Sequence, residues 1–471
     1  MSETRQVAVV GGGWAGCAAA VELARRGLQV TLFEAARTLG GRARAVEVDG
    51  RLLDNGQHIL LGAYKETLGL LKRVGVDPSA ALLRLPLQMR YPPDAGGMDF
   101  VAPRLPAPWH MLVALLRAQG LAREDKLSLA RFSTTARWMG WRLDQDVSVS
   151  VLLARFDQTP RLQRLMWHPL CLAALNTAPE RASANVFLAV LRDSLGAKRA
   201  ASDMLVPRLE LSALFPQAAA RYLASKGGTV HSGAKVDALQ RVGAGWAVQA
   251  GGQALGGDWR GDFDAVVLAT PAAQSAALLA PFAEAADLSA QLGAFEYEPI
   301  ATCYLQYDPS LRLPLPLYAL LDEPALARFG QFVFDRGQLD AEQKGLLAVV
   351  VSAAAAAAVL GQDALARAIA AQLDAAFPGL GLAAPQWSRV ITEKRATFAC
   401  TPDLARPGTE TPLPGLVLAG DYTAGDYPAT LESAVRSGQA AASIILRGNR
   451  SGRKNGSLSQ GTGGDQAGSV Q

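Results

Sequence analysis

The chain has 471 residues, of which half are hydrophobic and 19% are charged, and its 46 basic and 42 acidic residues leave a formal net charge of +4. This balance is typical of a globular protein with more than one domain, and it excludes an intrinsically disordered chain. So small a positive excess argues against a dedicated nucleic-acid-binding protein, and we expect no nucleic-acid partner. The four cysteines and four histidines lack the spacing of a disulfide framework or a metal site, so we expect no metal.

The first elements expected along the chain form a βαβ unit. The apolar run Gln6–Val10 predicts a strand, Trp14–Arg26 predicts a helix and Leu28–Phe33 predicts a second strand. Glu34 ends this second strand. A carboxylate at that position can accept hydrogen bonds from both ribose hydroxyls of an adenosine.

The turn between the first strand and the helix carries the pattern Gly-x-Gly-x-x-Gly at Gly11, Gly13 and Gly16. The first glycine makes a tight turn, the second lets the backbone approach a pyrophosphate, and the third allows close packing of helix and strand. The helix N-terminus, with Trp14 and Ala15 in its first turn, offers free N–H groups and a positive dipole end to phosphates. The pattern therefore predicts a Rossmann-type dinucleotide site, although by itself it does not separate NAD from FAD.

Two kinds of segment alternate along the rest of the chain. Residues 76–204 hold helical patterns broken by Pro-rich stretches, and residues 276–408 mix strands and helices. Residues 205–275 and 409–447 return to the alternation of strand and helix seen in the first unit. We therefore expect an α/β fold in which a Rossmann-type cofactor-binding domain (residues 1–75, 205–275 and 409–447) is interrupted by an inserted α+β substrate-binding domain (residues 76–204 and 276–408).

The end of the chain and its most apolar segments bear on location. The last helix is expected to end near Leu446, and residues 448–471 are too poor in apolar side chains to fold, which predicts a disordered tail. No segment resembles a secretory signal, and Leu346–Gly361 falls short of the ~20 apolar residues that span a bilayer. We expect a cytoplasmic protein, with peripheral membrane contact left open.

Two features keep that membrane contact open. The segment Trp109–Leu116, which Arg117 follows, is interpreted either as an amphipathic entrance to a substrate tunnel that dips into lipid or as a helix that faces the core. The start of the tail is basic, which predicts either a solvated tail or weak attraction to an anionic membrane. Its basic residues are Arg447, Arg450, Arg453 and Lys454.

Two motifs near opposite ends of the chain resemble those of the amine oxidase and carotenoid desaturase superfamily of FAD enzymes. One is Leu39-Gly40-Gly41-Arg42-Ala43, which follows the second strand, and the other is Gly420-Asp421-Tyr422 followed by Pro428-Ala429-Thr430-Leu431. The resemblance implies FAD as the cofactor and an amine oxidase-like arrangement of a Rossmann-type FAD-binding domain with its insertion. It also implies that a helix N-terminus near residue 430 points at the flavin, where it would stabilise negative charge on the reduced ring.

The resemblance further implies which residues contact FAD. Arg42 and the neighbouring backbone would approach the pyrophosphate and flavin, Asp421 would hydrogen-bond the ribityl or pyrophosphate region, and Val236 would hold the adenine through its backbone. Together with the glycine turn and Glu34, the residues expected to bind the cofactor in these segments are Gly41, Arg42, Gly56, Gln57, Val236, Gly420, Asp421, Thr430 and Leu431.

Three further stretches resemble one subgroup of that superfamily, the squalene-associated FAD-dependent desaturases that are interpreted as hydroxysqualene dehydroxylases of hopanoid biosynthesis. The stretches are 54–64, 167–177 and 393–398. The wider superfamily usually shows a glycine-glycine-aromatic turn where this chain has Gly56-Gln57-His58. The resemblance implies reductive removal of an allylic hydroxyl from a long apolar C30 isoprenoid, which gives squalene.

That reaction needs a protein acid to protonate the hydroxyl, so that water leaves and reduced flavin delivers hydride to the allylic cation. His58 is the first candidate for the acid, because its turn is expected beside the flavin, and Asp54 and Tyr427 follow. The alternatives are that His58 only hydrogen-bonds the flavin or backbone and that Asp54 caps the turn. Lys394 either holds a water near the flavin or lies at the surface.

Two other functions stay open at this point. The cofactor motifs fit equally well a carotenoid desaturase or an amine oxidase-type flavoenzyme that oxidises its substrate. A flavin-free escort protein that binds isoprenoid groups has the same fold, but such a protein has no need for the intact motif at Gly420 and Asp421.

Overall fold

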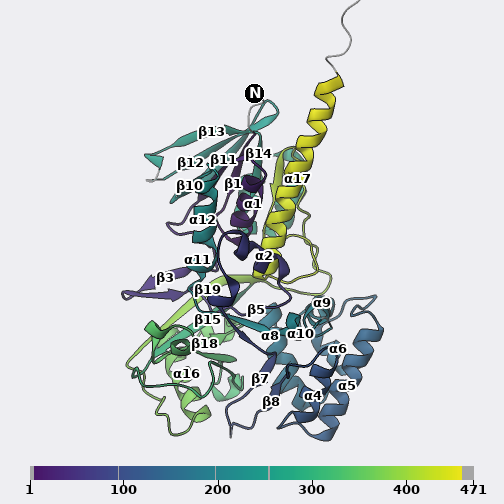
Figure 1. Ribbon diagram of the computed structural model, residues 1–471, viewed down its shortest axis with the longest axis vertical. Coiled ribbons are helices and arrows are strands. Elements are labelled where there is room, and N and C mark those ends of the chain that lie inside the picture. Colours follow the sequence, from purple (N-terminus) through teal and green to yellow (C-terminus); the bar gives the residue numbers. More distant parts are fainter. Residues whose placement is uncertain (1–4, 94, 197, 253–254, 459–471) are drawn as a thin grey trace, which may run out of the picture.

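The computed structural model describes residues 5–93, 95–196, 198–252 and 255–458, with side chains described as far as Gly448. Figure 1 shows two halves, an upper one built on a parallel sheet and a lower one built on an antiparallel sheet beside a group of helices. Each half contains segments from early and late parts of the sequence, as the colours of Figure 1 show.

The upper half is organised by a five-stranded parallel sheet with the strand order β10-β2-β1-β14-β20. Its strands are β1 (Gln6–Val10), β2 (Gln29–Glu34), β10 (Thr229–Ser232), β14 (Ala265–Leu268) and β20 (Leu416–Leu418). Val7 and Val9 pack into the core on one face of the sheet, whereas Ala8 and Val10 pack into the core on the other. Because both faces are buried there, β1, β14 and β20 are largely apolar, whereas the edge strand β10 is polar.

Helices cover one face of this sheet, and a small antiparallel sheet covers the other. The helices are α1 (Trp14–Arg25), α2 (Lys65–Arg73), α11 (Leu211–Leu214), α12 (Pro216–Ser225) and α17 (Leu431–Leu458). The covering strands are β11 (Lys235–Val242), β12 (Gly245–Gly251) and β13 (Trp259–Phe263). This is the layered α/β arrangement that the glycine turn and the first βαβ unit predict.

Glu432 ties α17 to α2 inside the upper half. Its fully buried carboxylate accepts hydrogen bonds from the backbone N–H groups of Glu66 (3.2 Å) and Thr67 (2.9 Å) and from the Thr67 hydroxyl (2.7 Å). Arg436, one turn further along α17, donates to the same carboxylate at 2.9 Å. The N-terminus of α2 and a guanidinium group are therefore both satisfied by one buried charge.

Replacing Glu432 with alanine is expected to lower the free energy of unfolding by about 2–4 kcal/mol, because buried Thr67 and the first turn of α2 lose their acceptor, whereas Arg436 is partly exposed. Thermal unfolding measured by circular dichroism checks this, with Glu284→Ala at an exposed position as the matched control. Equal melting temperatures for the two variants would contradict the role of Glu432.

The lower half contains a five-stranded sheet with the order β16-β17-β18-β15-β19. Its strands are β15 (Tyr297–Gln306), β16 (Leu317–Ala319), β17 (Phe332–Asp335), β18 (Leu346–Val351) and β19 (Trp387–Phe398). Helices α15 (Ala355–Ala358) and α16 (Gln362–Ala376) cover its outer face. The opposite face is turned to the upper half, since Tyr304 on β15 donates a hydrogen bond to the backbone oxygen of Asp54 at 2.7 Å.

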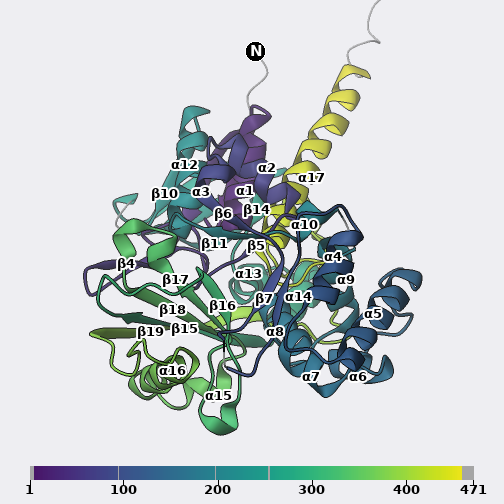
Figure 2. The same cartoon turned by 60° about the horizontal axis from the view of Figure 1, so that its bottom comes forward.

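A group of helices completes the lower half and lies beside this sheet (Figure 2). They are α4 (Trp109–Arg117), α5 (Arg123–Trp138), α6 (Val149–Arg155), α7 (Pro160–Leu162), α8 (His168–Leu175), α9 (Ala184–Ser194) and α10 (Arg199–Ser202). Asn176 joins the group to the sheet, because its side chain bonds to the backbone of Glu298 and Ala353 and to the Thr397 hydroxyl. One of the resembling stretches, 167–177, therefore lies at a structural junction.

Short elements connect the two halves. They are α3 (Pro78–Ala81), α13 (Ala272–Leu279), α14 (Ala286–Gly293), β3 (Ala45–Val48), β4 (Arg51–Asp54), β5 (Leu60–Leu61), β6 (Leu82–Leu85), β7 (Gln88–Arg90), β8 (Asp99–Val101) and β9 (Met204–Pro207). Strands β5 and β6 both pair with β9, and Leu82 belongs to the same core as α1. We therefore propose that the first boundary of the cofactor-binding domain lies after Leu85 rather than at residue 76.

The C-terminal helix is longer than the sequence indicates. We expected it to end near Leu446 and residues 448–471 to be disordered, but α17 continues to Leu458. The prediction is therefore wrong for 448–458, and residues 459–471 lie outside the described residues. The reason is that a helix already formed by packing adds one backbone hydrogen bond for each further residue, whereas starting a helix is costly.

Within the described part of the chain, none of the helices combines the length and the apolar character needed to cross a bilayer.

Candidate active site

The glycine turn packs so tightly that two of its positions have no room for a side chain. A Cβ atom on Gly16 would overlap the carbonyl oxygen of Gly11, and one on Gly11 would lie 2.5 Å from the carbonyl oxygen of Ala269. Gly13 differs, because the nearest atom to a Cβ there is the Cα of Gly41 at 3.9 Å. The turn is therefore closed toward the sheet and open at Gly13, which is the side from which a phosphate can approach.

The N-terminus of α1 is available to an anion. Gly13 is the residue before the helix and supplies no side-chain cap, and the first turn contains no acidic residue. The first helical hydrogen bond runs from the Cys17 N–H to the Gly13 oxygen at 2.9 Å. The N–H groups of Trp14, Ala15 and Gly16 therefore have no partner within the helix.

The Glu34 side chain holds the glycine turn through a hydrogen bond. Its carboxylate accepts hydrogen bonds from the N–H groups of Gly12 and Ala36, both at 2.7 Å, and each oxygen keeps a further lone pair for a ribose hydroxyl. The Ala234 N–H donates to the Glu34 backbone oxygen at 2.8 Å, which places the start of β11, with buried Val236, beside it. The structure thus brings together the two residues expected at the adenosine end.

The second motif lies directly against the first. The Gly40 N–H donates to the Gly12 oxygen at 2.8 Å, and the indole N–H of Trp14 donates to the Ala43 oxygen at 3.1 Å. Gly41 adopts a φ of +61°, the left-handed region in which glycine carries no penalty. Both N-terminal motifs therefore form one continuous surface.

Arg42 and Asp421 form an ion pair that joins the two ends of the chain. Nη2 of Arg42 lies 2.7 Å from both carboxylate oxygens of Asp421, and Nη1 donates to the Ala396 oxygen at 2.6 Å. The sequence predicts that each of the two residues contacts the cofactor, but no sequence pattern indicates that they form an ion pair with each other. The charge-assisted contact holds the C-terminal motif against the N-terminal one.

Arg406 holds the loop that follows Asp421, and sequence reasoning missed it. Its guanidinium donates to the backbone oxygens of Tyr427 (2.7 Å), Gly425 (3.2 Å) and Asp421 (3.4 Å), and also to that of Thr423. A lone arginine in a Pro-containing loop carries no local signal of this role.

The N-terminus of α17 is capped in a way that leaves N–H groups free. The Ser433 N–H donates to the Thr430 hydroxyl at 3.1 Å, and the Thr430 N–H donates to the Ser433 hydroxyl at 3.0 Å. The N–H groups of Leu431 and the next residue have no partner within the helix. A Cβ on Gly438 would overlap the Ala15 oxygen, so α17 packs in direct contact with the first turn of α1.

A chain of hydrogen bonds fixes the turn that contains His58. Arg336 donates to the Gln57 side chain at 3.1 Å, Gln57 donates to the Tyr304 hydroxyl at 2.8 Å, and Tyr304 donates to the backbone oxygen of Asp54 at 2.7 Å. Gln57 is thus held by the lower sheet. The sequence does not indicate Arg336 or Tyr304, since both are distant along the chain.

His58 is held at one ring nitrogen only. Its Nδ1 lies 3.0 Å from the Gly56 backbone oxygen, which accepts a hydrogen bond and so assigns the Nδ1 proton. Burial lowers the pKa of His58, the bond to Gly56 opposes this, and the positive charge of Arg42 lowers it further. Protonated His58 is therefore a stronger acid than an ordinary histidine.

Thr302 faces the same turn from the sheet. Its hydroxyl is fully buried and has no hydrogen-bond partner among the described residues. A Cβ built on Gly56 would lie 3.8 Å from this hydroxyl and 3.9 Å from Cε1 of His58. Val350 and Ile391, which pair with Thr302 across the sheet, are partly accessible. One hydroxyl between two apolar side chains therefore lies opposite His58.

Asp54 is a buried acid at the start of this turn. Its Oδ1 accepts a hydrogen bond from the Leu211 N–H at 2.8 Å. Burial raises the pKa of Asp54 to about 6, although Arg336 and the Leu211 bond lower it. Asp54 therefore caps α11, and it keeps its proton over a wider pH range than an exposed aspartate does.

The raised pKa of Asp54 predicts a pH dependence of stability. Because the folded state binds this proton more tightly than the unfolded state, the free energy of unfolding falls as pH rises from about 4 to about 6. Asp54→Asn keeps an oxygen that can accept from the Leu211 N–H but no longer titrates. In this variant the free energy of unfolding is expected to fall by about 3 kcal/mol less over this pH range than in the unchanged protein. Urea unfolding of both proteins at several pH values checks this, and parallel curves would contradict it.

The structure places Tyr427 against another partner and Lys394 at the surface. The Tyr427 hydroxyl donates to Asp193 at 2.8 Å, and burial raises the pKa of Tyr427, so its proton is not available to a substrate. Lys394 is exposed, as its surface alternative expects. We therefore propose His58 rather than Tyr427 as the proton donor.

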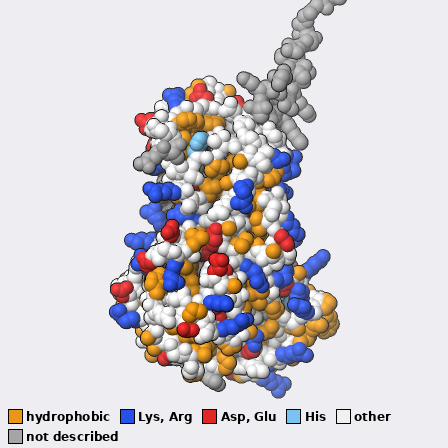
Figure 3. Space-filling model, turned by 60° about the vertical axis from the view of Figure 1, so that its left-hand side comes forward, with side chains coloured by type: hydrophobic (Ala, Val, Ile, Leu, Met, Phe, Trp, Pro, Cys, Tyr) orange, Lys and Arg blue, Asp and Glu red, His pale blue; other side chains and the backbone are white. Residues whose placement is uncertain are grey.

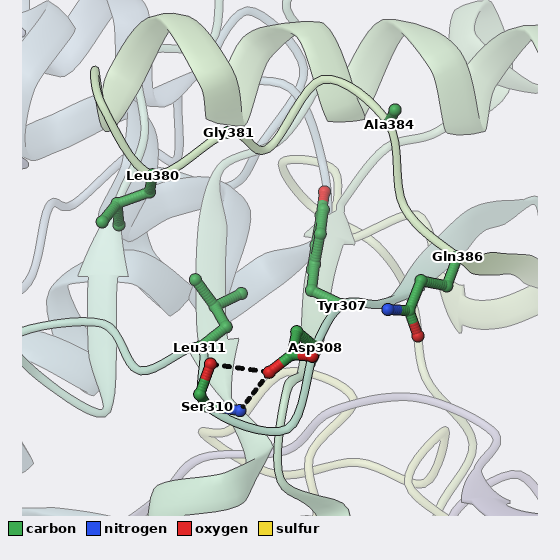
Figure 4. A pocket seen from close by; sticks show the side chains of 8 residues that line it. All are labelled: Tyr307, Asp308, Ser310, Leu311, Leu380, Gly381, Ala384 and Gln386. Atoms are coloured by element: carbon green, nitrogen blue, oxygen red, sulfur yellow. Dashed lines mark hydrogen bonds between the residues drawn. The ribbon is translucent and has the colours of Figure 1, made fainter.

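No group of three or more potential metal ligands occurs among the residues that the structure describes. A surface hollow of about 250 Å³ lies after the end of β15. Figure 4 shows its lining, which includes Tyr307, Asp308, Ser310, Leu380 and Gln386. None of the residues described above lines it, so this hollow is separate from the candidate active site.

The chain belongs to the family of flavin containing amine oxidoreductases, whose model matches residues 14–446. It is 31% identical to the hydroxysqualene dehydroxylase of Rhodopseudomonas palustris and 29% identical to that of Sinorhizobium fredii. These matches cover 96% and 94% of this chain and 100% and 98% of the relatives. It is also 25% identical to a probable zeta-carotene desaturase of Synechococcus elongatus, over 94% of this chain and 98% of that protein.

Solved structures agree on the fold. An oxidoreductase from Methanosarcina mazei superposes with a TM-score of 0.69 at 16% identity, over 92% of this chain and 99% of that one. Cyclohexylamine oxidase from Brevibacterium oxydans superposes with a TM-score of 0.66 at 17% identity, over 95% of this chain and 100% of that one. The amine oxidase-like fold expected from the motifs is confirmed.

The protein is thus an FAD-dependent oxidoreductase. The residues of the site fit this cofactor, because the open side at Gly13, the free N–H groups of α1 and the remaining lone pairs of Glu34 meet the needs of an adenosine diphosphate. The arginine of the Arg42–Asp421 pair and the N-terminus of α17 would complete the site at the flavin end.

Proposed function

We propose that this protein catalyses the reductive dehydroxylation of hydroxysqualene to squalene, a step of hopanoid biosynthesis. The observation that carries the proposal is the identity of 31% to a hydroxysqualene dehydroxylase over nearly the full length of both chains. The stretches 54–64, 167–177 and 393–398, which resemble the same subgroup, meet around the inner face of the lower sheet.

The inner face of the lower sheet supports this choice of substrate. Val350 and Ile391 offer apolar contact to a hydrocarbon chain, while the Thr302 hydroxyl is a polar group near Gly56 that has no partner among the described residues. A substrate with one hydroxyl on a long apolar chain matches this distribution. Thr302 would accept or donate a single hydrogen bond to the hydroxyl that is removed.

The chemistry needs one proton and one hydride. When bound and reduced, FAD supplies the hydride. His58 holds the proton that the leaving hydroxyl takes, so that the C–O bond breaks with loss of water and a C–H bond replaces it. The hydrogen bond from Nδ1 to Gly56 fixes the imidazole ring and leaves Nε2 as the position for the transferred proton.

A second candidate is a carotenoid desaturase, which the match to a probable zeta-carotene desaturase favours. Its reaction runs in the opposite electronic sense, because the substrate is oxidised and FAD is reduced. The two candidates therefore differ in which redox state of the protein consumes the substrate.

The test is a single-turnover reaction under anaerobic conditions. The FAD-loaded protein is reduced and mixed with hydroxysqualene, and the expected result is squalene in an amount equal to the flavin that becomes oxidised. Unchanged hydroxysqualene, together with flavin reduction when the oxidised protein meets a carotenoid precursor, would replace the proposal with the second candidate.

A further inference from the structure

Helix α4 presents apolar side chains on both of its faces. Ala114 and Leu115 are buried in the main hydrophobic core, and His110 is buried beside them. On the opposite face, Trp109 is 58% exposed and Leu116 is 66% exposed. A helix that is apolar all round is normally buried on all sides or in contact with lipid. The outer face of α4 is apolar, but no other described part of the protein covers it.

The exposed side chains lie in one stripe. Trp109, Leu112 and Leu116 follow a spacing of three and four residues, which places them along one line of the helix. Leu105, which lies before the helix, is exposed as well. We call these four residues, Leu105, Trp109, Leu112 and Leu116, the α4 stripe.

Exposure alone does not single out this surface. Figure 3 shows that another face of the molecule also carries hydrophobic side chains among its Lys and Arg residues, as protein surfaces generally do. The α4 stripe differs because three of its four members are aligned on one short helix and one of these is a tryptophan, the residue that favours the boundary between lipid and water.

The chain segment that carries the α4 stripe is basic. Residues 101–142 contain seven Lys or Arg and two Asp or Glu, a net charge of +5, whereas the whole chain carries +4. One of the two acids, Asp125, is buried. Arg104 and Arg117 are exposed at the two ends of the stripe, and Lys126 donates to the Leu116 backbone oxygen at 2.9 Å. The apolar stripe is therefore framed by positive charge.

We propose that the α4 stripe docks the protein on an anionic lipid bilayer. The apolar side chains enter the boundary between headgroups and acyl chains, and Arg104, Arg117 and Lys126 contact the lipid phosphates. The charge decides between a bilayer and a second copy of this chain, because two copies facing each other through α4 would bring their positive charges together. The proposal rests on the proposed function in one respect, which is that an isoprenoid substrate would dissolve in the bilayer to which the protein docks.

Flotation of the FAD-loaded full chain with vesicles tests the docking without any substrate. Vesicles of phosphatidylcholine with phosphatidylglycerol are expected to carry the protein, and high salt is expected to release part of it. Leu112→Ser combined with Leu116→Ser is expected to lower the partition coefficient at least about tenfold, because two apolar side chains no longer enter the lipid. Arg104→Gln combined with Arg117→Gln is expected to lower it about tenfold on anionic vesicles only.

The matched control replaces two exposed apolar residues outside the stripe, Leu326 and Val359, with serine. This variant is expected to float like the unchanged protein. Equal flotation of the Leu112/Leu116 variant and the unchanged protein would overturn the proposal. So would a dimer in sedimentation velocity without lipid that the Leu112/Leu116 variant abolishes, since the stripe would then bind a second copy.

Discussion

Replacing Gly16 with alanine is expected to weaken FAD binding more than about a hundredfold. The new Cβ would overlap the Gly11 carbonyl oxygen, so α1 or the turn must move. The free N–H groups of α1 would then no longer be positioned to donate hydrogen bonds to the phosphates. Two charge-assisted hydrogen bonds contribute about 3–6 kcal/mol, and each 1.4 kcal/mol corresponds to about tenfold in affinity. Titration of the protein with FAD, followed by flavin fluorescence, measures the change.

The helix α2 offers a control for this substitution. A Cβ on Gly69 meets no atom within 4 Å, so Gly69→Ala is expected to bind FAD like the unchanged protein and to be slightly more stable. Circular dichroism establishes that the Gly16→Ala variant keeps its helices. A folded Gly16→Ala variant with unchanged FAD affinity would show that the phosphates lie elsewhere.

Replacing His58 with glutamine is expected to lower the rate of dehydroxylation by about 10²–10⁴-fold, which is the usual contribution of a general acid. Glutamine can still donate to the Gly56 oxygen, so the turn and the FAD affinity should be preserved. The rate constant of the single-turnover reaction measures the effect, and the FAD titration serves as its control.

The pH dependence separates proton donation from mere positioning by His58. Because the donor must be protonated, the rate should fall as pH rises through the pKa of His58, which burial and Arg42 hold below the ordinary value of 6.5. In His58→Gln this decline should disappear. A variant that keeps the same pH profile at a reduced rate would assign proton donation to another group, with Asp54 the next to test.

Local patterns in the sequence predict the cofactor end of the site well. Gly11 and Gly16 lie in one turn, and Glu34 follows after one helix and one strand. Their roles follow from the backbone geometry of the βαβ unit. The motif at Gly420 and Asp421 is equally local. The structure adds that these segments contact one another, which the family resemblance implies only indirectly.

The substrate end is harder to predict, since its residues meet only after folding. Thr302 is one threonine in an apolar strand, and only the partner strands and the turn at Gly56 give its hydroxyl a position. Arg336 and Arg406 lie in loops and act on backbone or amide oxygens far away in sequence. A single sequence has no periodicity that marks such contacts.

The ion pair between Arg42 and Asp421 also bears on how the protein is made. A ribosome delivers the chain from its N-terminus, so the glycine turn and Arg42 emerge long before Asp421 and the first turn of α17. Until then the parallel sheet lacks its edge strand β20, and α1 lacks the helix that packs on it. We therefore expect the cofactor to bind only after these C-terminal segments have joined the fold, and a nascent chain stalled before residue 416 is expected to remain colourless.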